Sequence, residues 1–333
     1  NGSLFDDASI PTLAKLKCRN EDLLKAVRNL SIIEQEGSIR RINYVDLGVE
    51  EIGSIYESLL EFTPRVASED EDIEGKFVNA HRFFLDPRGT ARKTTGSYYT
   101  PPQLVDELIK SALIPVLEQK LEDGDDDEQA LLSMKVCDPA MGSAAFLIAA
   151  TNYLGRRLAF IRTGQEEPPD DDIQRARRDV LQHCIYGVDL NPMAVELAKV
   201  SLWIETSVKD MPLNFLDHHL KLGNSLIGAT KELLDKPLPN EAFNAKTGDV
   251  KKIASEIKAR NKLEQNQRTF AEFETSTTKD WSRNFEKLND IIEANPEDVD
   301  KKKHLYEELT STDEWKHEKF LADAWAAAFF WPL

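Results

Sequence analysis

The chain has 333 residues, of which 41% are hydrophobic and 30% charged, as in a globular protein of one large or two ordinary domains. No apolar run approaches the length of a membrane span, and the N-terminus has no basic-then-apolar signal pattern, so we expect a cytoplasmic protein without membrane contact. The formal net charge of −17 argues against a surface built mainly to grip nucleic acid, because clustered Lys and Arg bind phosphates.

Cysteine and histidine spacing does not predict a metal site. Cys18, Cys137 and Cys184 form no C-x-x-C pair, and the last two fall in predicted core strands, where we expect reduced, buried thiols. The six histidines include one close pair, His218 and His219, without a third ligand at a recognisable spacing. We therefore expect these two histidines to lie exposed in a loop.

The N-terminal 92 residues are predicted to form a helical domain. Apolar side chains such as Leu23, Val27 and Leu30 recur at three- and four-residue steps, which is typical of amphipathic helices. The acidic stretch 68–75 is predicted as a solvated loop. A Glu-Gly-Lys triplet follows its acids, but no apolar strand surrounds the triplet, so a metal-dependent nuclease site is not favoured.

A helix start is predicted within residues 92–102 (RKTTGSYYTPP), which precede apolar residues at helical spacing. Thr100 suits the N-cap position and Pro101 the first helical position. The unpaired N–H groups of such a helix could bind an anion, although a capped helix without a ligand is the alternative.

Residues 135–148 (KVCDPAMGSAAFLI) predict a strand, a tight loop and a helix. Ligands of open α/β sheets bind beyond the carboxyl ends of the strands, and Gly142 would let a ligand approach the backbone closely. The loop lacks the Gly-x-Gly-x-x-Gly spacing of a dinucleotide site and the Gly-Lys-Ser/Thr of a P-loop. A smaller nucleoside ligand fits better, with a purely structural turn as the alternative.

Two further strand-and-turn patterns follow. Residues 183–189 (HCIYGVD) end in Asp189, where an acidic side chain can hold a ribose through its hydroxyls. Asn191 is a natural N-cap for the helix that comes next. A third strand is expected near 220–222, and Asn224 just after it could bind an adenine or simply form a turn.

These three patterns predict an α/β fold with a parallel sheet. We expect strands near residues 134–138, 184–189 and 218–222, lying side by side in the order third, second, first. The order follows because each helical crossover between parallel strands must be right-handed.

In this order, the GSYYTPP string, the DPAMGS loop and the GNSLIG turn resemble motifs of the N6-adenine DNA methyltransferases, above all those of type I and type IIG restriction-modification systems. The resemblance covers roughly residues 40–230. It implies a Rossmann-like class I methyltransferase core with a truncated parallel sheet, S-adenosyl-L-methionine (AdoMet) as cofactor, DNA as substrate, and a role in restriction-modification or related phage defence.

The resemblance also implies a set of cofactor-binding residues. In that family a Thr and its neighbouring Tyr meet the methionine carboxylate, the loop contacts the cofactor, and an Asp or Asn after the third strand binds the adenine. The acid after the second strand lies far more than about twenty residues beyond the loop glycine, which favours AdoMet over NAD. The residues carried over are Tyr98, Tyr99, Thr100, Asp138, Pro139, Ala140, Gly142, Asp189, Leu190, Asn224 and Ser225.

Three parts of the chain are expected. Residues 1–92 would form a helical N-terminal and connector domain, residues 93–230 a partial AdoMet-binding core, and residues 231–333 a helical insertion that leads into a missing catalytic half. In the last part, apolar stripes that include Trp281 and Phe285 predict a helical hairpin.

No catalytic residue is assigned, because the sequence lacks the Asn/Asp-Pro-Pro-aromatic tetrapeptide with which the family orients the target adenine. We expect a chain that ends just before the catalytic strand, that is inactive alone, and that meets double-stranded DNA mostly through regions outside it. The strand at 134–138 would then have a free edge, covered by self-association or by Phe329, Phe330 and Trp331.

Other functions stay open at this point. The main alternative is a non-catalytic α/β nucleotide-binding or protein-interaction module, and a methyltransferase acting on RNA, protein or small molecules is a weaker one. An Asn-Pro-Pro-aromatic sequence soon after Leu333 in the parent gene would favour the DNA methyltransferase.

Overall fold

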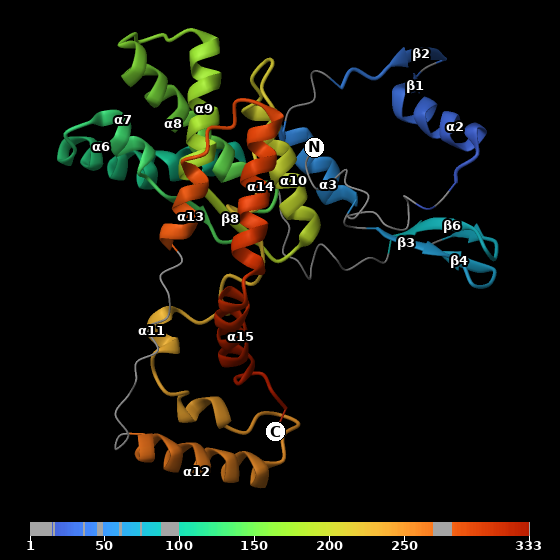
Figure 1. Cartoon of the computed structure of the whole chain (residues 1–333). Coiled ribbons are helices and arrows are strands. Elements are labelled where there is room, and N and C mark those ends of the chain that lie inside the picture. The colour runs from blue at the N-terminus through green and yellow to red at the C-terminus, as the bar shows by residue number, and fades with distance from the viewer. Residues whose placement is uncertain are drawn as a thin grey trace. The chain divides into compact units, whose positions relative to one another are not determined.

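The computed structural model describes residues 15, 17–35, 37–44, 49–59, 62–73, 75–87, 100–268 and 282–332 (Figure 1). Predictions that involve Tyr98, Tyr99 and Trp281 lie outside these residues. The chain divides into two compact units, Asn1–Leu222 and Gly223–Leu333.

The first unit contains a three-stranded parallel sheet, made of β7 (Val136–Asp138), β8 (Ile185–Asp189) and β9 (Leu220–Leu222). The strand order is β7-β8-β9, so the second strand in the chain lies in the middle. Gly187 of β8 pairs with Asp138 of β7, and Asp189 of β8 pairs with Leu222 of β9. The predicted strands, their parallel direction and their order are confirmed, and the fold is mixed α/β.

The helices of this part of the first unit are α5 (Pro102–Leu108), a π-helical turn (Ile109–Leu113), α6 (Ile114–Asp123), α7 (Asp127–Leu132), α8 (Ala145–Thr163), α9 (Asp170–Cys184) and α10 (Pro192–Glu205). α8 follows β7, α10 follows β8, and both pack against the sheet. Leu147, Leu154 and Leu158 of α8 and Leu181 of α9 are at most 1% exposed and belong to one apolar core. Their burial is the main stabilising contribution to this unit.

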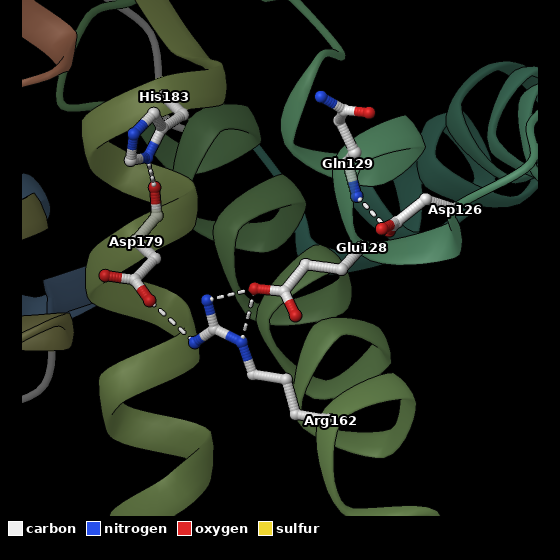
Figure 2. Close-up of polar contacts among 6 residues, drawn as sticks. All are labelled: Asp126, Glu128, Gln129, Arg162, Asp179 and His183. Carbon is white, nitrogen blue, oxygen red and sulfur yellow. Dashed lines mark hydrogen bonds and ion pairs between the residues drawn. The ribbon is translucent and has the colours of Figure 1, made fainter.

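Arg162 links three of these helices (Figure 2). From the last turn of α8 its Nε and Nη2 donate to Glu128 Oε1 of α7 at 2.9 and 2.7 Å, and its Nη1 donates to Asp179 Oδ2 of α9 at 2.6 Å. Asp126 caps α7 by accepting from the N–H of Gln129 at 2.9 Å. These charge-assisted bonds hold the ends of helices whose apolar faces form the core.

Short strands make the N-terminal region less helical than predicted. Its described elements are α2 (Asn20–Ser31), β1 (Ile32–Gln35), β2 (Ser38–Arg41), α3 (Val49–Leu59), β3 (Thr63–Val66), β4 (Glu71–Ile73), β5 (Lys76–Val78) and β6 (Phe83–Asp86). β1 pairs with β2, β3 with β6 and β4 with β5, all antiparallel. Strands of three or four residues show too few alternations to be recognised in the sequence.

The predicted solvated loop at 68–75 is therefore wrong for residues 71–73, which form β4, whereas residues 68–70 are exposed and outside any strand. β4 and β5 pair around Gly75, whose φ of +83° a side chain would disfavour. The N–H of Gly75 donates to Asp72 Oδ1 at 2.8 Å, which closes the turn. Acidic residues in this stretch thus form part of a β-hairpin, whereas the sequence pattern predicted a polar loop.

Two predictions about thiols and histidines are also wrong. Cys137 lies in β7 but is exposed, and Cys184, although buried, is the last residue of α9 and not part of a strand. Burial raises the pKa of the Cys184 thiol to about 12. His219 is 3% exposed, and its ring centroid lies 4.0 Å from that of Tyr186 and 4.0 Å from that of His218. Tilted ring contacts just before β9, which no spacing rule reveals, accompany the burial of this imidazole.

The second unit is helical, as predicted. Its described elements are α11 (Lys231–Leu234), a 3₁₀ turn (Asn240–Phe243), α12 (Lys251–Arg268), α13 (Ser282–Asn289), α14 (Pro296–Ser311) and α15 (Asp313–Ala327). The ring centroid of Phe285 in α13 lies 6.2 Å from that of Tyr306 in α14 and 5.2 Å from that of Trp315 in α15. These contacts confirm that α13 and α14 pack as a hairpin.

The C-terminal aromatic residues are only partly packed within the second unit. The ring centroids of Trp325 and Phe329 lie 4.9 Å apart, whereas Phe330 and Trp331 are 63% and 68% exposed. That this tail covers the β7 edge stays a prediction.

Among the described residues, no helix combines the length and apolar character that a membrane crossing requires.

Gly187 allows the loop and helix after β7 to approach β8. A Cβ at this position would lie 2.3 Å from Met141 Sδ and 3.0 Å from Leu147 Cδ1. Gly187→Ala should lower the free energy of unfolding by about 1–3 kcal/mol, because overpacking displaces both side chains. Urea unfolding curves would measure this.

Gly223→Ala is the matched control, since a Cβ at Gly223 meets no atom within 4 Å. Its midpoint should stay the same or rise slightly. An equal decrease in the free energy of unfolding in the two variants would contradict the close approach of Met141 and Leu147 to β8.

Candidate cofactor site

The parallel sheet brings two carboxylates to one edge. Asp138 is the last residue of β7, and Asp189 is the last residue of β8. Because β7 and β8 are parallel neighbours, their carboxyl ends meet at the same edge. The loop at residues 139–144 starts from this edge and leads into α8.

Backbone contacts define the path of this loop. Asp138 Oδ1 accepts from the N–H of Ala140 at 3.0 Å, and the N–H of Met141 donates to the carbonyl of Val188 in β8 at 3.0 Å. Gly142 has a φ of +52° and Ala144 a φ of +75°. Two left-handed residues so close together turn the chain sharply, and the one at Ala144 is strained because it carries a Cβ.

Asp189 joins the loop to the start of α10. Its Oδ2 accepts from the N–H of Gly142 at 2.9 Å, and its Oδ1 accepts from the N–H of Asn191 at 2.8 Å. Asn191 in turn caps α10 as predicted, accepting from the N–H of Met193 at 3.0 Å. The carboxylate is 9% exposed, and each oxygen retains a second lone pair that could accept from a ligand hydroxyl.

Asp138 is less well satisfied than Asp189. Its Oδ2 is buried and has no hydrogen-bond partner within the described part of the chain. Burial is the largest cause that raises the pKa of Asp138, the charge of Asp189 raises it further, and the N–H of Ala140 opposes them. A buried carboxylate oxygen in this situation would gain from a cation or a hydrogen-bond donor beside it.

Exposed apolar residues lie beside the two carboxylates in the sequence. Pro139 and Ala140 are exposed after β7, and Leu190 is 55% exposed after β8. Three of the predicted cofactor residues thus offer uncovered apolar surface at the edge where ligands of parallel sheets bind.

Thr100 does not cap the next helix as predicted. α5 begins at Pro102 with Pro101 as its N-cap, and no side chain caps it, so the helix starts one residue later than the prediction. The residue before a proline is disfavoured in the α region, which explains why Pro101 stays outside the helix. Thr100 is half-buried and precedes the helix, and the neighbouring Tyr98 and Tyr99 lie outside the described residues.

Asn224 forms a turn at the start of the second unit. Its Oδ1 accepts from the N–H of Leu226 at 3.0 Å, and both Asn224 and Ser225 are exposed. The turn alternative is therefore observed, while the adenine contact of Asn224 and Ser225 stays a prediction.

A cavity of about 390 Å³ lies along β7. It is lined by residues of the helical segment from Leu108 to Val116, by β7 and its flanks, and by Phe146, Leu147 and Ala150 of α8. Within the described residues β7 pairs with β8 alone, and Cys137 is exposed at the cavity. Partial removal from water and the charge of Asp138 raise the pKa of the Cys137 thiol, which keeps it in the neutral form.

The N-terminal helix α3 reaches the same loop. A Cβ on Gly53 would lie 3.0 Å from Ser143 Oγ, so this helix touches the loop closely. α3 also packs against α10, the helix that begins beside Asp189. This helix of the predicted connector domain thus supports both the loop after β7 and the helix after β8.

Comparison with known families identifies the family of this chain. The family description "N-6 DNA methylase" matches residues 71–281, which is more than half of the chain. The chain belongs to the N-6 DNA methylase family. The match begins at β4 and includes the whole parallel sheet, the loop after β7 and α12.

Two curated relatives carry consistent names. A Methanocaldococcus jannaschii protein named as a type II restriction enzyme and methyltransferase is 23% identical over 283 residues, covering 70% of this chain and 21% of that protein. The adenine-specific methyltransferase PglX of Streptomyces coelicolor is 29% identical over 156 residues, covering 43% of this chain and 11% of that protein. The chain thus spans about a fifth or less of the length of these relatives.

Sequence reasoning on this N-6 DNA methylase missed two supporting glycines. Gly187 sits inside a buried strand, and a strand glycine is a recognised sign of close backbone approach. Gly53 gave no such sign, because its neighbour Ser143 is 90 positions away in the sequence. The double acceptor role of Asp189 was also missed, since both of its donors are backbone N–H groups.

Replacing Asp138 by Asn should stabilise the chain at neutral pH. Because the folded pKa of Asp138 is raised above its ordinary value of 3.8, its favourable contribution is complete below that value and is lost as pH rises through the raised pKa. An amide retains the Oδ1 acceptor for Ala140 without a buried charge. We expect Tm at pH 7 to rise, by about 2–4 °C for each kcal/mol gained.

Asp125→Asn removes the same charge from an exposed loop and should leave Tm unchanged. Melting curves between acid and neutral pH would show the difference between the variants. A lower Tm for Asp138→Asn across this range would contradict the argument.

Proposed function

We propose that this chain is the AdoMet-binding portion of a DNA adenine-N6 methyltransferase from a restriction-modification or related phage-defence system. The observation that carries the proposal is the buried Asp189 and the half-buried Asp138, whose Oδ2 is buried, at adjoining strand ends beside a small-residue loop. Membership in the N-6 DNA methylase family supports AdoMet as the cofactor and DNA as the substrate. The core would be of the Rossmann-like class I type.

The chemistry of the donors fits AdoMet part by part. AdoMet carries a cationic ammonium group, and the buried Oδ2 of Asp138 would gain from such a partner. The two ribose hydroxyls could donate to the free lone pairs of Asp189, which already accepts from two backbone N–H groups. Gly142 leaves the backbone of the loop open to close approach.

Other cofactor contacts remain part of the proposal. Thr100, with Tyr98 and Tyr99 before it, would meet the methionine carboxylate, and Asn224 with Ser225 would meet the adenine. When bound, AdoMet supplies an electrophilic methyl group on its sulfonium. The chain's own residues bind and orient that cofactor.

Orientation of the target adenine is a separate requirement. The adenine has to flip out of the base stack of the duplex, and its weakly nucleophilic amino group has to be oriented toward the methyl group of AdoMet. Proximity and orientation can account for about 7–11 kcal/mol of barrier lowering. The sequence contains no Asn-Pro-Pro-aromatic tetrapeptide, so we propose that this chain by itself binds AdoMet without methylating DNA.

The edge of β7 is the proposed place where the missing catalytic strand would pair. On the side away from β8, β7 has no strand partner among the described residues, and the 390 Å³ cavity beside it is apolar along the helical wall. An unpaired strand edge can also recruit a second copy of the chain. We propose that the isolated chain self-associates through this edge.

The family match argues against the main alternative, a module that binds nucleotides or proteins without any methyltransferase context. The proposed division into residues 1–92, 93–230 and 231–333 keeps the loop, both carboxylates and Asn224 in one middle part. The boundary between the two compact units, at Leu222 and Gly223, falls within this middle part.

Asp189→Asn should weaken AdoMet binding at least tenfold. The substitution removes the negative charge and one acceptor oxygen, and hydrogen bonds to charged groups contribute about 1.5–3 kcal/mol each. Titration calorimetry with AdoMet on the wild type and the variant would measure the change. Asp210→Asn is the matched control, because Asp210 is exposed, lies in the same unit and has a φ of +63°, which Asn tolerates.

Equal affinity of the wild type and Asp189→Asn for AdoMet would contradict the proposal that Asp189 binds the ribose. Transfer of radiolabelled methyl groups from AdoMet to DNA by the wild-type chain would remove the proposal that it lacks the target-binding half. Thermal melting of each variant, run alongside, separates lost contacts from lost folding.

A further inference from the structure

α12 is a basic helix in a strongly acidic chain. The segment from Lys246 to Arg268 contains seven basic and three acidic residues, whereas the whole chain has a net charge of −17. A local excess of cations against such a background needs a physical reason, because each lysine would otherwise find an acidic partner easily.

One face of α12 is fixed to the preceding segment. Asn261 Nδ2 donates to the carbonyl of Leu238 and to Asn240 Oδ1, both at 3.0 Å, and Gln265 Nε2 donates to the carbonyl of Leu238 at 2.6 Å. Ala254, 2% exposed, lies on the same side. These amide contacts settle which side of the helix faces solvent.

A row of three lysines runs beside that fixed face. Lys251, Lys258 and Lys262 are spaced by seven and four residues, which places them on one line along the helix, about 10 and 6 Å apart. Lys251 and Lys262 are exposed, and Lys258 Nζ donates to Asn244 Oδ1 at 2.7 Å, which leaves its charge uncompensated. We call these three residues the lysine row.

The lysine row differs from three lysines on other helices of the same unit. None of its three members forms an ion pair with any residue that the structure describes, whereas Lys301, Lys303 and Lys319 on α14 and α15 pair with Asp298, Glu307 and Asp323. On α12 itself, Arg260 pairs with Glu264 away from the row. Three unneutralised charges therefore lie on one line along α12, and the exposed Lys252, about 100° further round the helix, also has no ion pair in the described part of the chain.

We propose that the lysine row binds the phosphate backbone of double-stranded DNA. Each strand of a duplex carries one negative charge per 3.4 Å of helix axis, so cations about 6–10 Å apart can meet successive or alternate phosphates. Three cations without ion pairs suit a polyanion, whereas the centre of a protein interface is poor in charge. Held in place by the amide contacts, the lysines position the duplex without reading its sequence.

This inference rests on the proposed function and assigns a DNA contact to this chain, which the net charge alone had placed elsewhere. It does not require the chain to methylate DNA. Binding of AdoMet and binding of the duplex can therefore be measured separately on the same protein.

The test compares two triple variants of the 333-residue chain. The row variant carries Lys251→Gln, Lys258→Gln and Lys262→Gln, and the control carries Lys301→Gln, Lys303→Gln and Lys319→Gln, which removes equal charge from the same unit. Fluorescence anisotropy with a labelled short duplex of mixed sequence, between about 50 and 200 mM salt, gives Kd and its salt dependence.

The row variant should bind the duplex at least tenfold more weakly at low salt. Its slope of log K against log salt should be less steep than that of the wild type by about 2.7, since each phosphate contact contributes about 0.9. The control variant should match the wild type in both respects. All three proteins should bind AdoMet equally in calorimetry.

Equal duplex affinity and slope in the row variant and the wild type would overturn the proposal while the AdoMet proposal stands. Undetectable duplex binding by the wild type at low salt, or tighter binding of polyglutamate than of the duplex, would overturn it as well. Loss of duplex binding in the row variant, with no AdoMet binding by the wild type, would leave the lysine row supported and the proposed cofactor site refuted.

Discussion

The arrangement of the loops at the carboxyl ends of the strands depends on the carboxylate of Asp189. One oxygen accepts from Gly142 in the loop after β7, and the other accepts from Asn191 at the start of α10. The two connections that leave the carboxyl edge are thereby joined through a single side chain. A neutral or shorter residue would leave a buried backbone N–H unpaired, at a cost of about 1–3 kcal/mol.

This arrangement explains the state of the neighbouring Asp138. A second carboxylate near Asp189, partly removed from water, carries a raised pKa and a buried oxygen without a partner in the described residues. The chain thus holds one satisfied and one unsatisfied carboxylate side by side. A cationic ligand bearing ribose hydroxyls would complete both, which is the physical basis for proposing AdoMet at this edge.

Much of the core was predictable because it depends on strong local signals. Apolar strands that end in Asp138 and Asp189 gave the sheet and its order, and the Asn-Pro pair at Asn191 gave the start of α10. The N-terminal hairpins and the exposure of Cys137 were not predictable, since they depend on short pairings and on which neighbours a strand lacks. Roles filled by backbone N–H groups leave no trace in residue types.

Amide hydrogen exchange of the 333-residue chain, with and without saturating AdoMet, tests the central claim most directly. The account predicts protection of peptides that cover residues 139–150 and 189–195, where the loop and α10 leave the sheet, and no change near His183 at the opposite ends of the strands. Exchange unchanged at both carboxyl-edge peptides, or protected only near His183, would contradict the account.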